Sequence, residues 1–183
     1  MSLFDYLCPK ICVPSLSDVD LDDITARGIK TILLDLDNTI LPWKDYKVPP
    51  QSSEWIKSAL DRGIKLFIAS NTRNPKRLST VARELGIPYA YKIGKPGSRG
   101  LRAAMESLGA AQENTAIIGD QIFTDVLGGN RLLLFTILVQ PMHRREFIGT
   151  KVSRIFEKPV LAMLRRRGLL GTKRQDVKSQ LQG

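Results

Sequence analysis

Three observations predict that this chain is an α/β protein with a Rossmann-like, open parallel sheet and helices on both faces. Apolar, β-prone runs alternate with segments of helical periodicity, which is the pattern of strand–helix units. Polar residues directly follow four of those runs, as expected where the strand ends form a ligand site. The 183 residues, 43% of them hydrophobic and 25% charged, are enough for one ordinary core.

The first strand is expected at 31–36, and the loop after it is marked by Pro42, Pro49 and Pro50. Ser52 or Ser53 is expected to cap a helix that runs to about Arg62, because Gly63 then ends it. Further strands are expected at 64–69, 89–93, 115–118 and 132–139. Further helices are expected at 75–85, 97–108 and 125–130.

Two aspartates, Asp35 and Asp37, end the first expected strand. Residues i and i+2 of a strand point the same way, so both carboxylates can reach one pocket at the carboxyl edge of the sheet. There they can hold Mg²⁺ while one attacks as a nucleophile and the other carries a proton. The alternative is a solvated turn at the end of a strand, where aspartate is common.

The next strand ends carry the remaining candidate site residues, which are Ser70, Asn71, Lys95, Asp120 and Asp125. This set matches phosphoryl transfer, in which the charge on the phosphoryl oxygens must be neutralised. Lys95 and Mg²⁺ can neutralise that charge, and Ser70 can donate a hydrogen bond. Asp120 can supply a metal ligand, and Asp125 can orient Lys95 or a water molecule at the metal.

This ordered set resembles the haloacid dehalogenase (HAD) phosphatase superfamily. Four motifs carry the resemblance: Asp35-x-Asp37-x-Thr39, Ser70, Lys95 with Lys92 as the other candidate, and Gly119-Asp120 through Asp125. The resemblance implies that Asp35 becomes phosphorylated and that Asp37 is the general acid and base, with Lys95 completing the catalytic set. It implies a phosphate site of Ser70, Asn71 and Lys95, and a Mg²⁺ site of Asp35, Asp37 through its carbonyl, Asp120 and Asp125.

The chain also resembles the YqeG branch of that superfamily, which includes the mitochondrial and plastid-type phosphatidylglycerophosphate phosphatases. The added segments are Leu7-x-Pro9, Ser70-Asn71-Thr72, Gly94-Lys95-Pro96 and Gly128-Gly129-Asn130-Arg131. The intervals from Asp37 to Ser70 and from Ser70 to Lys95 are too short for the cap domain that HAD enzymes usually carry. An open site suits a substrate on a surface, such as a lipid headgroup, although a partner subunit can also act as the cap.

Positive charge is concentrated near the C-terminus. Residues 142–183 carry a net charge of +8, whereas residues 1–141 carry +2. We expect a capless phosphatase domain at 1–141, a basic amphipathic segment at 142–170 and a disordered tail at 171–183. The helical spacing of apolar residues over 151–167 fits either contact with an anionic membrane or packing of a last helix on the core.

The sequence therefore predicts a Mg²⁺-dependent phosphomonoesterase that converts phosphatidylglycerophosphate into phosphatidylglycerol, in the cytoplasm and in peripheral contact with a membrane. A phosphatase for a soluble metabolite or nucleotide, or an RNA- or ribosome-binding module on the same scaffold, are the alternatives. Nucleic acid is not favoured, because no aromatic platform is interleaved with the basic residues. Trp43 and Tyr46, after the first motif, either contact lipid or pack over their own loop. With Cys8, Cys12 and His143 alone, zinc, disulfide and imidazole chemistry are not expected.

Overall fold

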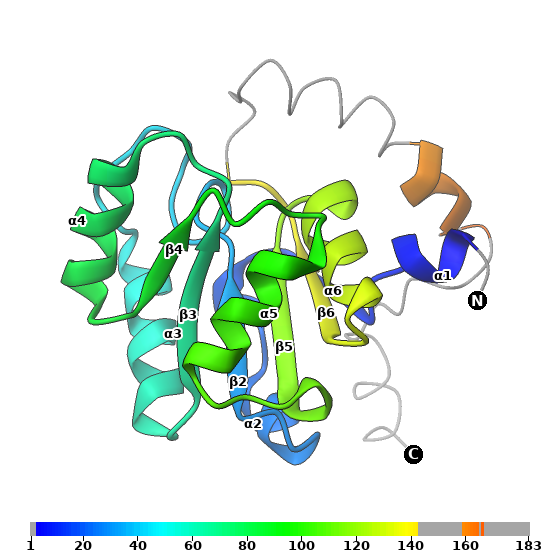
Figure 1. Ribbon diagram of the computed structural model, residues 1–183, viewed down its shortest axis with the longest axis horizontal. Helices are drawn as coiled ribbons and strands as arrows, with labels where there is room; N and C mark the ends of the chain where they lie inside the picture. The colour runs from blue at the N-terminus through cyan, green and yellow to red at the C-terminus, as the bar shows by residue number, and fades with distance from the viewer. Residues whose placement is uncertain (1–2, 143–158, 165, 167–183) are drawn as a thin grey trace, which may run out of the picture.

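A computed structural model describes residues 3–142, 159–164 and 166, and it contains a six-stranded parallel sheet (Figure 1). The strands are β1 (Ile11–Val13), β2 (Thr31–Leu34), β3 (Lys65–Ser70), β4 (Tyr89–Tyr91), β5 (Thr115–Gly119) and β6 (Phe135–Val139). Their spatial order is β1-β6-β5-β2-β3-β4, and every pair is parallel. The predicted α/β class, parallel sheet and missing cap are confirmed, because 38–69 and 71–94 are fully described and contain no further domain.

Helices cover both faces of the sheet. They are α1 (Leu3–Leu7), α2 (Leu21–Ala26), α3 (Pro50–Asp61), α4 (Pro75–Leu85), α5 (Ser98–Ser107) and α6 (Leu127–Arg131), with a π-helical turn η3 (Ile122–Val126) and the 3₁₀ turns η1 (Leu16–Asp18) and η2 (Gln112–Asn114). Ile32 and Leu34 of β2 belong to the core under α2, α3 and α4, whereas Leu33 belongs to the core under α5. This alternation is that of a strand buried on both faces.

Several elements differ from the sequence prediction: α1 and α2 were not predicted, and β2 ends at Leu34 rather than at residue 36. Helix α3 begins at Pro50 rather than after Ser52 or Ser53, because proline is favoured in the first turn, where its missing N–H costs nothing. Strand β1 was not predicted, since its three residues are too few for a period-2 pattern. Strand β6 begins only at Phe135, because Leu132 to Leu134 form the turn after α6.

The side chain of Asn130 fixes the N-terminal segment to the sheet. Its Nδ2 donates to the carbonyls of Tyr6 and Cys8, both at 2.9 Å, and its Oδ1 accepts from Thr136 Oγ1 at 3.0 Å. Asn130 is buried. Gly129 beside it has no room for a side chain, because a Cβ there would lie 2.4 Å from Ile117 Cγ2. The Gly-Gly-Asn and Leu-x-Pro segments of the sequence are therefore two sides of one structural contact.

We expect Asn130→Ala to lower the free energy of unfolding by about 2–4 kcal/mol, because the Tyr6 and Cys8 carbonyls and the buried Thr136 hydroxyl lose their partner. Chemical denaturation of purified protein measures this directly. Gln51→Ala is the control, since Gln51 is exposed on α3, and it should change stability by less than about 0.5 kcal/mol. Equal stability of the Asn130 variant and wild type would contradict the role given to Asn130.

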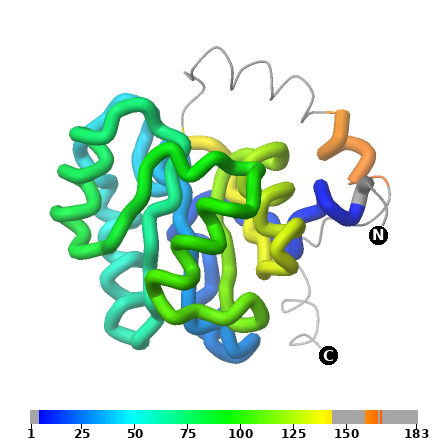
Figure 2. Tube along the Cα trace, in the orientation of Figure 1, coloured from blue at the N-terminus to red at the C-terminus, as the bar shows by residue number. Residues whose placement is uncertain are grey.

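Residues 159–164 are helical and pack against the domain near α1 (Figure 2). Leu164 is fully buried, and Val160 and Leu161 contact the cluster of Leu7, Ile122, Val126 and Leu138. The predicted apolar stripe thus packs on the core over this part. The rest of the predicted basic segment and the predicted disordered tail lie outside the described residues. No helix among the described residues is long and apolar enough to span a membrane.

Candidate active site

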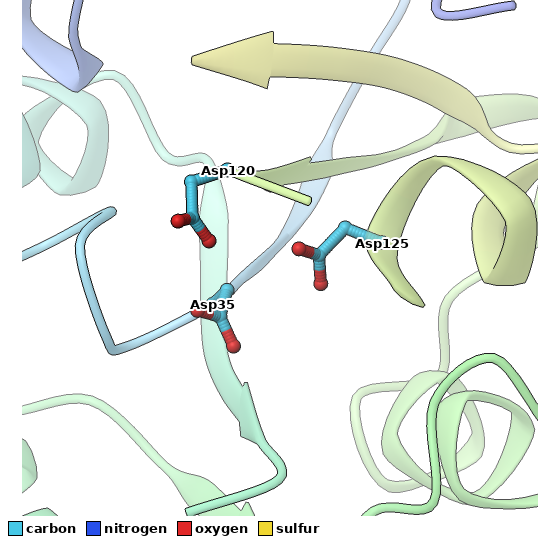
Figure 3. Close-up of side chains that lie close together, drawn as sticks. All are labelled: Asp35, Asp120 and Asp125. Carbon is cyan, nitrogen blue, oxygen red and sulfur yellow. The ribbon is translucent and has the colours of Figure 1, made fainter. Parts of the chain in front are cut away.

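Three carboxylates meet at the carboxyl edge of the sheet. Asp35 follows β2, Asp120 follows β5, and Asp125 projects from η3 toward both of them (Figure 3). All three residues are buried, and one ligand oxygen from each lies within 4.8 Å of the others. Adjacent parallel strands β2 and β5 end side by side, which is why residues 85 positions apart in sequence converge here.

Lys95 lies within this acidic cluster. Its Nζ is 2.6 Å from Asp35 Oδ1 and 2.6 Å from Asp125 Oδ1, and its side chain is almost completely buried. Burial disfavours the ammonium, but the two carboxylates more than offset this effect and raise the pKa of Lys95 above its ordinary value. Lys95 is therefore a fixed positive charge beside the predicted nucleophile, and Lys92 is exposed.

Asn71 holds the loop that carries Lys95. Its Oδ1 accepts from the backbone N–H groups of Gly94 and Lys95, at 2.9 and 3.1 Å, and its Nδ2 donates to the Lys95 carbonyl at 2.9 Å. Ser70 is buried at the end of β3, and its Oγ accepts from the Thr72 N–H at 3.1 Å, which leaves its hydroxyl proton for another acceptor. Of the three residues predicted to bind phosphate, Asn71 thus has its amide on the Lys95 loop.

Gly119 is required by the position of Asp125. A Cβ on Gly119 would lie 2.1 Å from Asp125 Cγ, a separation that two carbon atoms cannot adopt. The Asp125 carboxylate in turn accepts from the N–H of Gln121 at 3.2 Å and contacts Lys95. The Gly-Asp motif therefore combines a candidate metal ligand, Asp120, with the space that a second carboxylate needs.

We expect Gly119→Ala to reduce phosphatase activity at least about tenfold, because displacement of Asp125 moves Lys95 as well. The measurement is kcat on a soluble phosphomonoester. Gly109→Ala is the control, because Gly109 lies in the turn after α5, away from the carboxylates, and no atom lies within 4 Å of a Cβ built there. It strains only a positive-φ turn, so it should lower stability while leaving kcat within about twofold.

The cluster has an excess of negative charge. Three carboxylates face one lysine, and Asp35 Oδ2 is buried without a hydrogen bond from any described residue. Burial, together with the charges of Asp125 and Asp37, raises the pKa of Asp35 to about 7 against the opposing effect of Lys95. A divalent cation bound by Asp35, Asp120 and Asp125 would balance this charge, and an all-oxygen donor set suits Mg²⁺.

The pKa of Asp35 has a consequence for stability without metal. An unfolded aspartate has a pKa near 3.8, so the raised folded value means that the folded state holds this proton more tightly. Below about pH 4 Asp35 is protonated in both states and does not lower the stability of the metal-free fold. Above about pH 7 its buried carboxylate is ionised and lowers that stability by the full amount. We expect Mg²⁺ to raise the melting temperature clearly at pH 8 and little at pH 5, where protons compete. An equal shift at both pH values would contradict this account.

Asp37 does not join the three carboxylates but pairs with Arg77, a residue that the sequence analysis missed. Arg77 Nη1 lies 2.6 Å from Asp37 Oδ1, and its Nε donates to the Asp45 carbonyl at 2.6 Å. The Asp37 side chain keeps 20% of its surface exposed, whereas that of Arg77 keeps 3%. Arg77 shares the buried face of α4 with Val81 and Leu85, and a charge at that spacing was the available signal.

Comparison with known proteins gives one family. A model of the haloacid dehalogenase-like hydrolases matches residues 43–132. The probable phosphatase YqeG of Bacillus subtilis is 34% identical over 89% of this chain and 94% of its own. Phosphatidylglycerophosphate phosphatase 1 of Arabidopsis thaliana is 26% identical over 88% of this chain and 48% of its own. The solved HAD phosphatase of Thermococcus onnurineus, 15% identical, shares the fold with a TM-score of 0.52 over 66% of this chain and 90% of its own.

Proposed function

Because the chain belongs to the haloacid dehalogenase-like hydrolases and its site is that of a phosphatase, we propose that it is a Mg²⁺-dependent phosphatase for phosphatidylglycerophosphate, with phosphatidylglycerol as the product. The observation that carries the proposal is the buried cluster in which Lys95 lies 2.6 Å from both Asp35 and Asp125. Such a cluster pairs a nucleophilic carboxylate with a fixed positive charge for phosphoryl oxygens.

The reaction needs two displacements at phosphorus. In the first, the Asp35 carboxylate attacks the phosphorus and the bond to the lipid oxygen breaks, while Asp37 gives that oxygen a proton. In the second, water attacks the same phosphorus, Asp37 takes a proton from the water, and the bond to Asp35 breaks. When bound, Mg²⁺ would neutralise charge on Asp35, Asp120, Asp125 and the phosphate.

Lys95 and Ser70 stabilise the transferring group. The ammonium of Lys95 is already beside Asp35, so it can neutralise phosphoryl oxygens without moving far. The Ser70 hydroxyl can donate its proton to a phosphoryl oxygen. Asn71, which was predicted to bind phosphate itself, is proposed to act by holding the Lys95 loop.

Two further observations support a lipid substrate. The Arabidopsis relative, which this chain matches over about half of that protein's length, is a phosphatidylglycerophosphate phosphatase. In this chain neither interval between the site residues holds a cap, so the carboxyl edge is not enclosed by the described part of the domain. A bilayer that presents the headgroup can then exclude water from the site.

The experiment is phosphate release from phosphatidylglycerophosphate dispersed in a neutral detergent, with Mg²⁺, against soluble sugar and nucleotide phosphates. We expect kcat/KM for the lipid to exceed that for each soluble phosphate at least about a hundredfold. Equal or faster hydrolysis of a soluble phosphate would keep the phosphatase and reject the lipid. Mg²⁺ removal by chelation should stop release in every case.

A further inference from the structure

We infer that three aromatic–lysine pairs beside the site form the surface that docks this protein on an anionic bilayer. The pairs are Trp43–Lys44, Tyr46–Lys47 and Tyr91–Lys92, and we call them the aromatic–lysine rim. No other aromatic residue in the chain is followed directly by lysine. The inference rests on the proposed lipid substrate, since it names the membrane face that would bring that lipid to Asp35.

All three pairs lie where strands end at the catalytic edge. The loop with the first two follows β2 and Asp37, and Arg77 binds it through the Asp45 carbonyl. The third pair ends β4, where Tyr91 is in register with Ser70 of β3. In Figure 1 both loops lie at the end of the sheet toward which β3 and β4 point.

The side chains have the chemistry of a membrane interface. Tyr46 keeps 53% and Tyr91 50% of their surface exposed, and Trp43 is half-buried. Tyrosine and tryptophan rings favour the headgroup level of a bilayer, and each nearby lysine is attracted to anionic lipid. The rim, its first loop and the loop that follows β3 carry four exposed cations, which are Lys44, Lys47, Arg73 and Lys92. They carry one exposed carboxylate, that of Asp45.

The rim geometry favours lipid over single-stranded nucleic acid, which also binds aromatic and basic residues. Lys44 Nζ lies 4.4 Å from the centroid of the Trp43 ring, and Lys92 Nζ lies 5.9 Å from that of Tyr91. An ammonium group therefore lies on one side of each of these two rings, where a base would otherwise stack. A lysine over the ring of the preceding residue presents charge and apolar surface together, as a headgroup layer requires.

The backbone maintains this arrangement at a cost. Lys44 and Lys92 both adopt left-handed conformations, with φ of 70° and 50°, which non-glycine residues seldom adopt. Such strain is concentrated at functional sites, where the surrounding structure keeps it in place. Two separate loops thus place a lysine in the same unusual conformation directly after an aromatic residue.

The test is cosedimentation of the full chain with vesicles of phosphatidylglycerol and phosphatidylcholine that contain no phosphatidylglycerophosphate. We expect Lys44→Glu/Lys92→Glu to lower the partition coefficient by about tenfold or more. The matched control is Lys10→Glu/Lys30→Glu, which makes the same change in net charge at exposed positions before β1 and β2, at the opposite edge. It should lower the coefficient less than threefold, and melting temperatures should confirm that both variants fold.

The aromatic part is tested separately. Tyr46→Ala/Tyr91→Ala should reduce the binding that persists in high salt, where charge attraction is screened. Vesicles should also shift the fluorescence of Trp43 toward the blue, and Trp43→Phe should remove the shift because Trp55, the other tryptophan, is already buried.

Three results would overturn the inference: no binding by wild type, equal loss in the rim and control variants, or no loss in either. If the rim variant bound RNA more weakly than wild type but bound vesicles equally well, the rim would instead be a nucleic-acid surface. Because these vesicles hold no substrate, the outcome is independent of hydrolysis. Failure of the proposed substrate would appear instead in the detergent assay, as missing phosphate release from the lipid or as equal or faster hydrolysis of a soluble phosphate.

Discussion

Asp35→Asn should abolish phosphate release, with a fall in kcat on the order of 10⁵-fold on any phosphomonoester. The change keeps the size of the side chain and removes only the charge and the nucleophilic oxygen. In the structure this carboxylate is buried and lies 2.6 Å from the Lys95 ammonium, so the variant also loses this ion pair. The measurement is steady-state phosphate release with Mg²⁺ present.

The same variant separates lost chemistry from lost folding. Since burial and nearby carboxylates raise the pKa of Asp35 to about 7, its ionised form destabilises the metal-free fold at pH 8. We therefore expect the metal-free Asp35→Asn protein to melt at or above the wild-type temperature at pH 8. Glu106→Gln on α5, exposed and away from the site, is the matched control and should change neither activity nor melting. Retained turnover in Asp35→Asn would refute the nucleophile.

Arg77→Met should lower kcat by about a hundredfold or more with a smaller effect on KM. General acid–base catalysis contributes about 10² to 10⁴, and Arg77 holds the proposed acid and base, Asp37, at 2.6 Å. Arg77 acts through Asp37 rather than on the substrate, so it is a positioning residue. The readout that distinguishes this role is the split between kcat and KM, since a residue that positions Asp37 should change kcat far more than KM.

Two further variants control for a merely structural effect of Arg77. Arg77→Lys keeps the positive charge but loses the bonds to the Asp45 and Pro42 carbonyls, so it should restore part of kcat. Arg83→Ala, on the exposed side of the same helix, should leave kcat within about twofold. A Met variant with lower stability but an unchanged kcat would contradict the positioning role.

The sequence predicted the parallel sheet because strands and helices alternate with turn residues between them, and α4 (Pro75–Leu85) was predicted at both ends. It could not predict β1, whose three residues pair with β6 only through contacts of long sequence separation. It placed the start of α3 three or four residues late, because a serine cap and a proline first turn are both compatible with the sequence alone.

For the site, spacing and strand ends placed Asp35, Lys95, Asp120 and Asp125 together, and the structure brings these four into one cluster. The orientation of Asp37 toward Arg77 was not predictable, because it depends on how α4 packs over the loop after β2. Asn71 likewise was predicted to bind phosphate, while in the structure its amide binds the Lys95 loop. Motifs identify which residues meet, whereas packing decides what each side chain touches.

Reductive trapping tests the central claim most directly. Borohydride added during turnover of phosphatidylglycerophosphate converts an aspartyl phosphate into homoserine, which peptide mass spectrometry can locate. We expect homoserine at position 35 only, dependent on substrate and Mg²⁺ and absent from Asp35→Asn. Turnover with no trapped residue at position 35, or trapping at a different carboxylate, would contradict the proposal that Asp35 is the nucleophile.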